Sequence, residues 1–327
     1  MKLKYIAFVV LGLFLLKTSK SQDSQFSQFY SSPLYLSPSL TGATEKTRFI
    51  ANYRNQWPNL PKAYTDYAFS FDHYLYDYKS GIGAMIFRTQ EGGVYNTTNL
   101  GLTYSYTIPV NREISIRPGM KAGYYFRNID YNSIDFADQL TRSAVSSIEI
   151  PKEEMVKHYD FSTSALVYSS FYWFGFTGDH LLSLNKNFSD DPTYPALKIS
   201  VYGGAQMNLF ESVISKVDRT FTVSFFYKNQ ARFNQLDLGA YYEEHPFRIG
   251  LFFRGVPVFK DNAGMNAVVL LAGYTYRDIL INYSYDISTS RLLASTGGAH
   301  EISLSYQFQL GWGGKSNKLG AVPCPHF

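Results

Sequence analysis

The feature that most constrains this chain is a strict alternation of apolar and polar residues. From Leu100 to Ile108 every second residue is leucine, tyrosine or isoleucine, and the residues between them are glycine, threonine or serine. A period of two is typical of a β-strand with one apolar face. With Asn99 the segment has about ten residues, the length that a tilted strand needs to cross a bilayer, whereas strands of soluble sheets usually have about 5 or 6.

Segments with this pattern recur along the whole chain. Hydrocarbon offers no partner to the backbone groups of an open sheet edge, so strands that span lipid must close into a cylinder, and bacterial cylinders have an even number of strands. The sequence therefore predicts an all-β fold, a closed antiparallel transmembrane β-barrel of about 14 strands. The expected strands lie near 46–56, 63–76, 80–89, 97–108, 112–127, 159–168, 171–177, 196–209, 218–228, 234–243, 247–254, 264–276, 277–288 and 299–310.

The polar face of each strand is expected to line the lumen with small polar side chains, together with charged ones such as Arg117 and Lys121. A lumen enclosed by about 14 strands is too wide to be filled by side chains alone. We therefore expect it to be occupied by the amino-terminal segment, by the loop 128–158 or by the chain of a partner. Two packed sheets of a soluble protein are the alternative fold, and it would also be rich in tyrosine.

Composition favours the barrel over the soluble alternative. The chain has 28 Tyr and 26 Phe, and charged residues make up 17% of it. Ordinary soluble domains contain about 25% charged residues. An excess of aromatic residues without long apolar runs is what a barrel wall with aromatic girdles at both membrane interfaces requires.

The chain begins with the features of a cleavable signal peptide. Two lysines precede an apolar stretch at 5–16, and the small-x-small site Ser19-Lys20-Ser21 indicates cleavage before Gln22. The apolar stretch is shorter than the roughly 20 residues of a membrane-spanning helix. Removal of residues 1–21 lowers the number of basic residues from 30 to 26, which equals the 26 acidic residues, so charge gives no reason to expect a nucleic-acid partner.

The segment before the first strand combines two prolines with many serine and aromatic residues. A plug in the lumen, a contact with a periplasmic partner and a loosely ordered linker all remain open for it. The expected domains are a signal peptide at 1–21, a periplasmic or plug segment at 22–45, the transmembrane β-barrel at 46–310 and a periplasmic tail at 311–327.

The links between the expected strands alternate between short turns and long loops. Short turns of outer-membrane barrels face the periplasm, so this alternation predicts a protein of the cell outer membrane with both termini in the periplasm. The long outer loops are expected at 128–158, 178–195, 255–262 and 288–298.

Several patches resemble a known family. They are, in chain order, Phe26-Ser27-Gln28-Phe29, the run 32–38, Arg54-Asn55-Gln56-Trp57, the run 297–304 and the ending Cys324-Pro325-His326-Phe327. Their order and spacing are similar, over essentially the whole mature chain, to those of the PorP/SprF family of the Bacteroidota type IX secretion system. Ser24 and Ser39 stand where the family usually has Pro and Ala. The resemblance implies an outer-membrane barrel that serves secretion or surface attachment of cargo proteins through their C-terminal domains, in adhesion and gliding motility.

Two groups of residues are candidates for contact with a partner. Arg54 and Trp57 end the first strand at the expected outer rim, and Arg and Trp often anchor protein interfaces. Alternatively, Trp57 belongs to the aromatic girdle and Arg54 pairs inside the lumen with an acid such as Asp66 or Asp72. The second group consists of residues in the long loops that no strand pattern buries. They are Ile129, Tyr131, Ile134, Phe136, Phe188 and Tyr194, which could instead pack on one another over the barrel mouth.

No motif in the chain predicts catalysis. Asp179, His180 and Ser183 have the residue types of a hydrolase triad, but no G-x-S-x-G elbow accompanies them. His300 and Glu301 are neighbours in a strand and should point to opposite faces, so they cannot bind a metal together. Cys324 is the single cysteine, which excludes an internal disulfide. We predict a protein that is not an enzyme, with no catalytic, cofactor-binding or metal-binding residue and no cofactor.

Three functions follow from these patterns. The leading hypothesis, which rests on the resemblance, is a barrel that supports secretion and surface anchoring of type IX cargo by binding the C-terminal domain of a secreted surface adhesin. Other type IX secretion components and outer-membrane lipid are further expected partners. A passive porin-like channel is the second hypothesis and an outer-membrane hydrolase the third.

Overall fold

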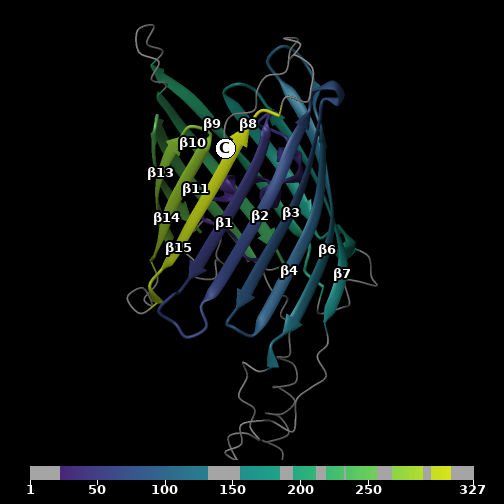
Figure 1. Ribbon diagram of the computed structural model, residues 1–327, viewed down its shortest axis with the longest axis vertical. Coiled ribbons are helices and arrows are strands. Elements are labelled where there is room, and N and C mark those ends of the chain that lie inside the picture. Colours follow the sequence, from purple (N-terminus) through teal and green to yellow (C-terminus); the bar gives the residue numbers. More distant parts are fainter. Residues whose placement is uncertain are drawn as a thin grey trace, which may run out of the picture.

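The computed structural model describes residues 23–131, 155–184, 194–210, 219–231, 233–255, 267–289 and 296–310. Within these residues, long strands form one antiparallel sheet that closes on itself as a tilted cylinder (Figure 1). The fourteen long strands are β1 (Thr47–Gln56), β2 (Tyr64–Leu75), β3 (Ser80–Glu91), β4 (Tyr95–Tyr106), β6 (Ser115–Ile129), β7 (Val156–Tyr168), β8 (Tyr172–Asp179), β9 (Lys198–Phe210), β10 (Arg219–Gln230), β11 (Phe233–Glu244), β12 (Phe247–Arg254), β13 (Ala267–Tyr276), β14 (Ile279–Ser288) and β15 (Ala299–Phe308).

The cylinder closes where the first and last strands meet. β1 pairs with β15 over ten residue pairs, from Thr47 opposite Phe308 to Gln56 opposite Ala299. Every other long strand pairs with its neighbours in the chain, and β4 reaches β6 directly. The two-residue strand β5 (Ile108–Pro109) continues the edge of β4 and pairs with the first two residues of β6. The prediction of a closed antiparallel barrel of about 14 strands is confirmed.

The two ends of the barrel differ. At the short-turn end, where β1 begins and β15 ends, strands are joined by brief links such as 169–171, 245–246 and 277–278. At the long-loop end, where β1 ends and β15 begins, lie the links 130–155, 180–197, 255–266 and 289–298.

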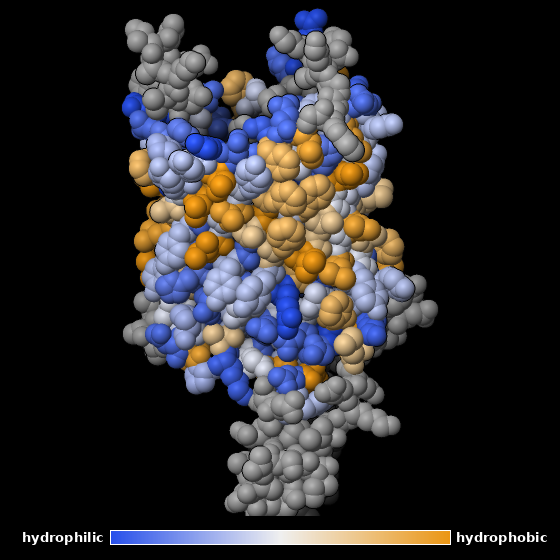
Figure 2. All heavy atoms as spheres, in the orientation of Figure 1, coloured by the Kyte–Doolittle hydropathy of each residue, from blue (hydrophilic) through white to orange (hydrophobic). Residues whose placement is uncertain are grey.

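The alternation of residues sorts side chains between the outside and the lumen. On β4, Leu102 is 68% exposed while its neighbour Thr103 is buried. Arg117 and Lys121 of β6 are buried in the lumen, as their phase predicts. Figure 2 shows hydrophobic side chains gathered in a belt across the face that β1 to β4 form, with hydrophilic residues above and below it.

The lumen is not lined by small polar side chains throughout, and the prediction is wrong for parts of it. Met85 and Phe87 of β3 are buried against Phe26 and Leu34. Buried serine, threonine and charged residues face inward from β1 to β6, β14 and β15. Between β7 and β13 large apolar side chains also point inward, because they pack against residues 29–43 rather than against water. They are Leu166, Tyr168, Trp173, Tyr202, Phe226, Tyr241, Phe252, Val269 and Leu271.

Helical structure is brief and lies outside the strands. The segment before β1 contains η1 (Phe29–Ser31), α2 (Pro33–Leu36) and η2 (Pro38–Leu40), and links between strands contain η3 (Tyr76–Tyr78) and η5 (Leu181–Leu184). Among the described residues, no helix has the length and apolar character to span a membrane.

Substitution of Leu102 by arginine tests the assignment of the outer face. Because Leu102 points outward from the middle of β4, Leu102→Arg is expected to lower the free energy of unfolding by roughly 2–4 kcal/mol in lipid vesicles. Tyr78→Arg at the short-turn end, where the side chain is also exposed, should cost at most about 1 kcal/mol. Urea titrations of both refolded variants measure the difference, and equal small costs would contradict a lipid-facing Leu102.

Candidate functional site

The N-terminal segment, residues 23–46, runs through the lumen from one end of the barrel to the other. Asp23 contacts His180 and Lys198 at the long-loop end, where β8 ends and β9 begins. Further along, the Gly42 N–H donates a hydrogen bond to Asp72 at 2.7 Å, towards the short-turn end of β2. Residues 26–43 are buried with the exception of Tyr35. The segment therefore occupies the space that the strands enclose.

Two prolines give the middle of the segment its compact shape. Pro33 opens α2 and Pro38 opens η2, positions where the missing proline N–H is not needed. The Ser37 N–H donates to the Pro33 carbonyl at 2.8 Å, and the Thr41 N–H donates to the Pro38 carbonyl at 3.1 Å. These turns provide hydrogen-bond partners for backbone groups within the segment itself. Buried backbone groups need such partners, and the wall offers only side chains to them.

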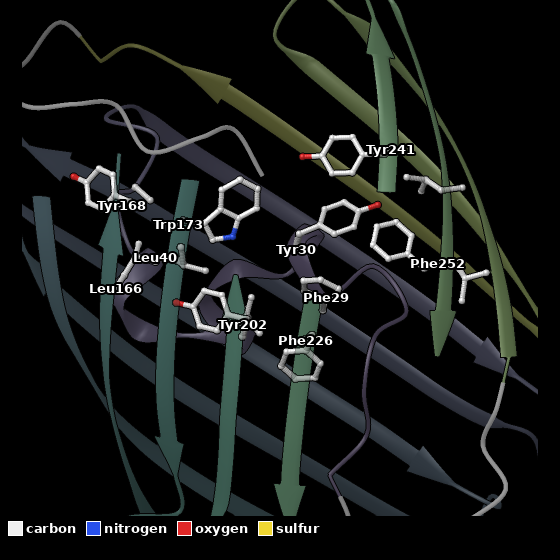
Figure 3. Packing of buried hydrophobic residues seen from close by; sticks show 14 residues of the cluster. Phe29, Tyr30, Leu40, Leu166, Tyr168, Trp173, Tyr202, Phe226, Tyr241 and Phe252 are labelled. Atoms are coloured by element: carbon white, nitrogen blue, oxygen red, sulfur yellow. The ribbon is translucent and has the colours of Figure 1, made fainter. Parts of the chain in front are cut away.

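Aromatic side chains hold the segment against one side of the lumen (Figure 3). Phe29 stacks on Phe226 of β10 with ring centroids 5.3 Å apart. Tyr30 stacks on Tyr241 of β11 at 5.5 Å and on Phe252 of β12 at 5.6 Å. Such aromatic pairs add about 0.5–1.5 kcal/mol each beyond the area that they bury.

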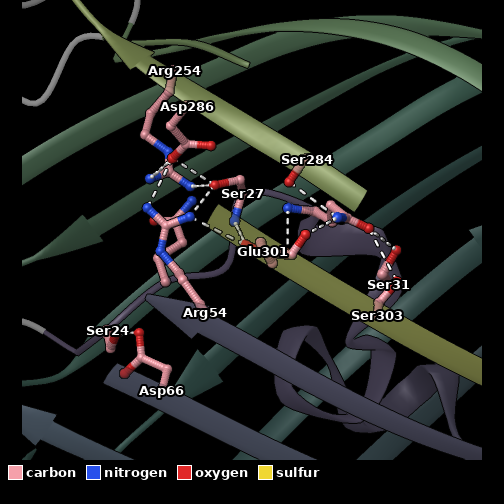
Figure 4. A network of polar contacts seen from close by, with 12 residues as sticks. Ser24, Ser27, Ser31, Arg54, Asp66, Arg254, Ser284, Asp286, Glu301 and Ser303 are labelled. Atoms are coloured by element: carbon pink, nitrogen blue, oxygen red, sulfur yellow. Dashed lines mark hydrogen bonds and ion pairs between the residues drawn. The ribbon is translucent and has the colours of Figure 1, made fainter. Parts of the chain in front are cut away.

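A polar network holds the opposite side of the same turn (Figure 4). Arg54 of β1 forms ion pairs with Asp286 of β14 at 2.8 Å and with Glu301 of β15 at 3.2 Å. The Ser27 N–H donates to Glu301 at 2.6 Å and the Ser27 hydroxyl donates to Asp286 at 2.7 Å. The Gln28 N–H donates to the second oxygen of Glu301 at 3.0 Å. Arg54 thus shares Glu301 with backbone N–H groups of the segment, and it shares Asp286 with the hydroxyl of Ser27.

A second network, here called the charge latch, fixes the amino end of the segment. Nε2 of His180 lies 2.8 Å from a carboxylate oxygen of Asp23, and Nδ1 lies 3.1 Å from Asp160. Lys198 reaches Asp23 at 3.1 Å and Asp179 at 3.2 Å, and Lys121 reaches Asp179 at 3.2 Å. The charge latch consists of Asp23, Lys121, Asp160, Asp179, His180 and Lys198.

The electrostatics of the charge latch favour its ionised form. Burial alone would lower the pKa of His180, but the carboxylates of Asp23 and Asp160 outweigh it and raise the pKa to about 10. Burial alone would raise the pKa of Asp23, whereas His180 and Lys198 bring this pKa well below its ordinary value. At neutral pH His180 and Asp23 are therefore both charged, and the ion pair between them is formed.

The wall has a glycine at a point where the segment passes close to it. A Cβ atom added to Gly119 of β6 would lie 2.3 Å from the backbone nitrogen of Ser39. The Ser39 N–H also donates a hydrogen bond to the hydroxyl of Ser164 on β7 at 2.8 Å. The backbone of η2 consequently lies directly on the strands at this point, and a larger residue at 119 would displace it.

A family model described as "Type IX secretion system membrane protein PorP/SprF" matches residues 18–306. The chain belongs to the PorP/SprF family. It is an outer-membrane β-barrel associated with type IX secretion. No curated protein matches the chain.

Several solved outer-membrane structures are similar to this PorP/SprF barrel. The outer membrane protein Omp33 of Acinetobacter baumannii is 7% identical, with a TM-score of 0.44 and coverage of 82% of this chain and 100% of its own. The CymD monoaromatic hydrocarbon channel is 12% identical, with a TM-score of 0.45 and coverage of 88% and 95%. The KdgM porin is 8% identical, with a TM-score of 0.38 and coverage of 80% and 99%.

The structure places the predicted partner-binding residues of this PorP/SprF barrel in different surroundings. Arg54 is 1% exposed and directed into the lumen; its acid partners are Asp286 and Glu301, while Asp72 pairs with Arg48 instead. Trp57 lies at the long-loop rim, where its ring contacts Tyr64 edge-on.

The loop residues predicted to bind a partner are only partly described. Ile129 and Tyr131 are half-buried where β6 ends. Tyr194 is buried, donates a hydrogen bond to the Tyr159 carbonyl at 3.0 Å and packs its ring on His158. Ile134, Phe136 and Phe188 lie outside the described residues, as do Cys324 and the expected signal peptide.

Among the residues with possible chemistry, His180, His300 and Glu301 have structural partners. Glu301 points into the lumen while the His300 ring contacts the Tyr283 hydroxyl on the outer face, as their adjacency in a strand predicts. Both ring nitrogens of His180 face carboxylates, and the Ser183 hydroxyl has no hydrogen-bond partner in the described part of the chain. Among the described residues no cluster of His, Cys, Asp and Glu has an arrangement that could hold a metal ion.

Sequence reasoning missed the charge latch and the role of Ser27. The signal that was present is the phase of the alternation, which places charged residues such as Lys121 and Asp286 on the inner faces of their strands. Charges on inner faces require partners inside the lumen. Which charged residues meet depends on the stagger of the strands, and the stagger cannot be derived from a local sequence pattern.

Arg54 supports the first prediction for this site. Arg54→Met removes the cation that pairs with Glu301 and one of the two cations that pair with Asp286, the other being Arg254, so we expect it to lower the free energy of unfolding by roughly 3–5 kcal/mol. Arg219→Ala, which breaks the exposed pair with Glu244, is the matched control and should cost about 0–1 kcal/mol. Urea unfolding in detergent micelles measures both, and a cost for Arg54→Met no larger than that of the control would contradict the network.

His180 supports a prediction about pH. A histidine whose pKa rises from 6.5 to about 10 on folding contributes stability that is fully present below pH 6.5 and is lost as the pH rises through about 10. His180 faces Asp23 and Asp160, with Asp179, Lys121 and Lys198 around them. The stability difference between the native chain and His180→Gln should therefore shrink from pH 6 to pH 10.5. Urea midpoints across this range check it, and a constant difference would show that His180 is neutral in the folded protein.

Proposed function

We propose that this PorP/SprF barrel holds exported cargo at the outer surface of the outer membrane and is neither an open pore nor an enzyme. The observation that carries the proposal is the occupied lumen. The segment 23–46 extends from Asp23 at one end to β1 at the other. Cavities beside it measure about 20 Å³ and 30 Å³, which is room for a water molecule or two. A barrel filled in this way offers its loops and rims, rather than a channel, to other molecules.

The proposed orientation places the long-loop end outside the cell. Long loops on a rigid scaffold commonly carry binding function, whereas turns of two or three residues only join strands. With this orientation the end of β15 faces the periplasm, as the sequence predicts for the carboxyl terminus. Asp23, the second residue after the expected cleavage site, lies at the opposite end, so the amino terminus would face outward rather than into the periplasm.

The proposed partner is the C-terminal domain of a secreted surface adhesin, with other type IX secretion components and outer-membrane lipid as further partners. Trp57 at the rim and the half-buried Ile129 and Tyr131 support a contact at the long-loop end, because aromatic and aliphatic groups of this kind anchor interfaces. Ile134, Phe136 and Phe188 are proposed to extend the same surface, and Tyr194 to support it from below.

Deletion of residues 135–154, which leaves β7 intact, tests the proposed function. We expect the shortened chain to remain a folded barrel and to bind the purified cargo C-terminal domain at least ten-fold more weakly, because most of the longest loop is gone. Pull-down in mild detergent measures binding, and a shift of electrophoretic mobility on heating reports folding. The matched control is deletion of residues 212–217 at the short-turn end, which should leave binding unchanged.

Two outcomes would contradict the proposal. Unchanged cargo binding by the folded 135–154 deletion would move the contact away from this loop. A stable, cargo-independent conductance of the intact chain in planar bilayers would instead support a porin.

A further inference from the structure

The N-terminal segment is not part of the sheet that surrounds it. Among the described residues, none between 23 and 46 pairs with a strand, and the pairing that closes the cylinder, β1 with β15, forms without it. The hydrogen bonds that close the barrel are therefore complete whether or not the lumen is occupied. In this respect the segment resembles a bound ligand more than a structural element of the wall.

The contacts of the segment are those of a peptide in a binding site. Its backbone donates to side chains of the wall at several depths: Asp23 to Gln230, Ser27 to Glu301, Ser39 to Ser164 and Gly42 to Asp72. Side chains of the wall in turn donate to its carbonyls, as Asn52 does to Ser31 at 3.2 Å and Ser105 to Thr41 at 2.7 Å. Each contact depends on a fixed side chain of a rigid strand, which is how specific sites are built.

The segment is also attached at one end only. Its carboxyl end continues into β1 through Lys46, which is exposed. Its other end reaches the long-loop mouth, where the Asp23 side chain is still 18% exposed. If the expected cleavage takes place, one residue precedes Asp23, so the free end lies at this mouth and is held by the charge latch.

We propose that the lumen is a peptide-binding site, that the chain's own residues 23–45 occupy it in this structure, and that a second peptide of the same chemistry can replace them. The ligand class follows from the wall. It is an unbranched peptide with an acidic residue near its free amino end for His180 and Lys198. Next comes a serine followed by a glutamine, whose backbone N–H groups bind Glu301. Two adjacent aromatic residues then pack on Phe226 and Tyr241.

The close approach at Gly119 adds a size limit to this ligand. Backbone of the segment lies against Gly119 and Ser164 at the position of Ser39, where it forms the turn of η2, so a ligand with the same turn fits this part of β6 and β7. Pro38 supplies that turn in the native segment by opening η2. A peptide without it would place extended backbone and larger side chains at this point, and we expect it to bind more weakly.

The test uses the full-length chain with a protease site inserted between Glu45 and Lys46 and cut after folding. The cut protein is incubated with a fluorescent synthetic peptide of residues 22–45. We expect the labelled peptide to replace the cut segment, with the rise in anisotropy competed by unlabelled peptide. A peptide with Asp23→Asn and Ser27→Ala should bind at least ten-fold more weakly, and a scrambled peptide should not bind.

Variants of the wall sharpen the test. In the cut chain, His180→Ala should accelerate release of the segment at least ten-fold, because the Asp23 carboxylate loses one of its two cationic partners. Arg219 forms an exposed ion pair with Glu244 at the short-turn end, so Arg219→Ala should leave the release rate unchanged. A cut barrel that keeps its folded mobility but exchanges no peptide within a day, at a large excess of peptide, overturns the proposal.

A second measurement covers the case in which the insertion prevents folding. In the uncut chain with Ser24→Cys and Cys324→Ser, excess unlabelled peptide should raise the rate at which the thiol at position 24 reacts with a maleimide, because the peptide competes with the segment for the lumen. An unchanged rate of reaction would likewise overturn the proposal.

Discussion

Backbone groups of a spanning strand must find all their hydrogen-bond partners in adjacent strands, because hydrocarbon supplies none. In this protein the requirement is met by pairing β1 with β15, so that residues 47–56 and 299–308, the two ends of the described sheet, join each other. The same requirement explains β5. The pairing of β4 with β6 does not reach the first residues of β6, and Ile108 and Pro109 pair with them instead. The tilt and the stagger follow from a sheet that must close, and the outward apolar belt follows from the lipid that its outer face meets.

Closure by this many strands creates a wide lumen, and the fold solves that problem with its own amino-terminal residues. The solution is asymmetric. On the side of β10 to β12, Phe29 and Tyr30 meet aromatic residues of the wall. On the side of β14, β15 and β1, Ser27 and Gln28 meet carboxylates and Arg54. A turn that presents aromatic rings to one side and backbone N–H groups to the other can dock in only one orientation.

The buried charges are better understood as determinants of position than as sources of stability. Removing two charges from water costs several kcal/mol per ion, which their attraction only partly offsets, so a buried ion pair adds little net stability. An unmatched charge, however, is strongly unfavourable, and this penalty selects the arrangement in which every partner is found. The charge latch and the Arg54 network set the depth of the segment in this way: a shift by one residue would separate Asp23 from His180 and Ser27 from Glu301 at the same time.

The sequence by itself determined the strands and their faces, because a period of two is a local property. The strand expected at 247–254 is observed with the same bounds, and the one expected at 264–276 is observed over Ala267–Tyr276, the part of it that the structure describes. The inward position of Arg117 and Lys121 followed from the same phase. Only the tertiary structure decided the partners of Arg54, the aromatic side of the lumen and the place of residues 23–46. Each of these depends on which inward residues of distant strands share a height in the barrel, and that height is set by the stagger of the closed sheet, to which all strands contribute together.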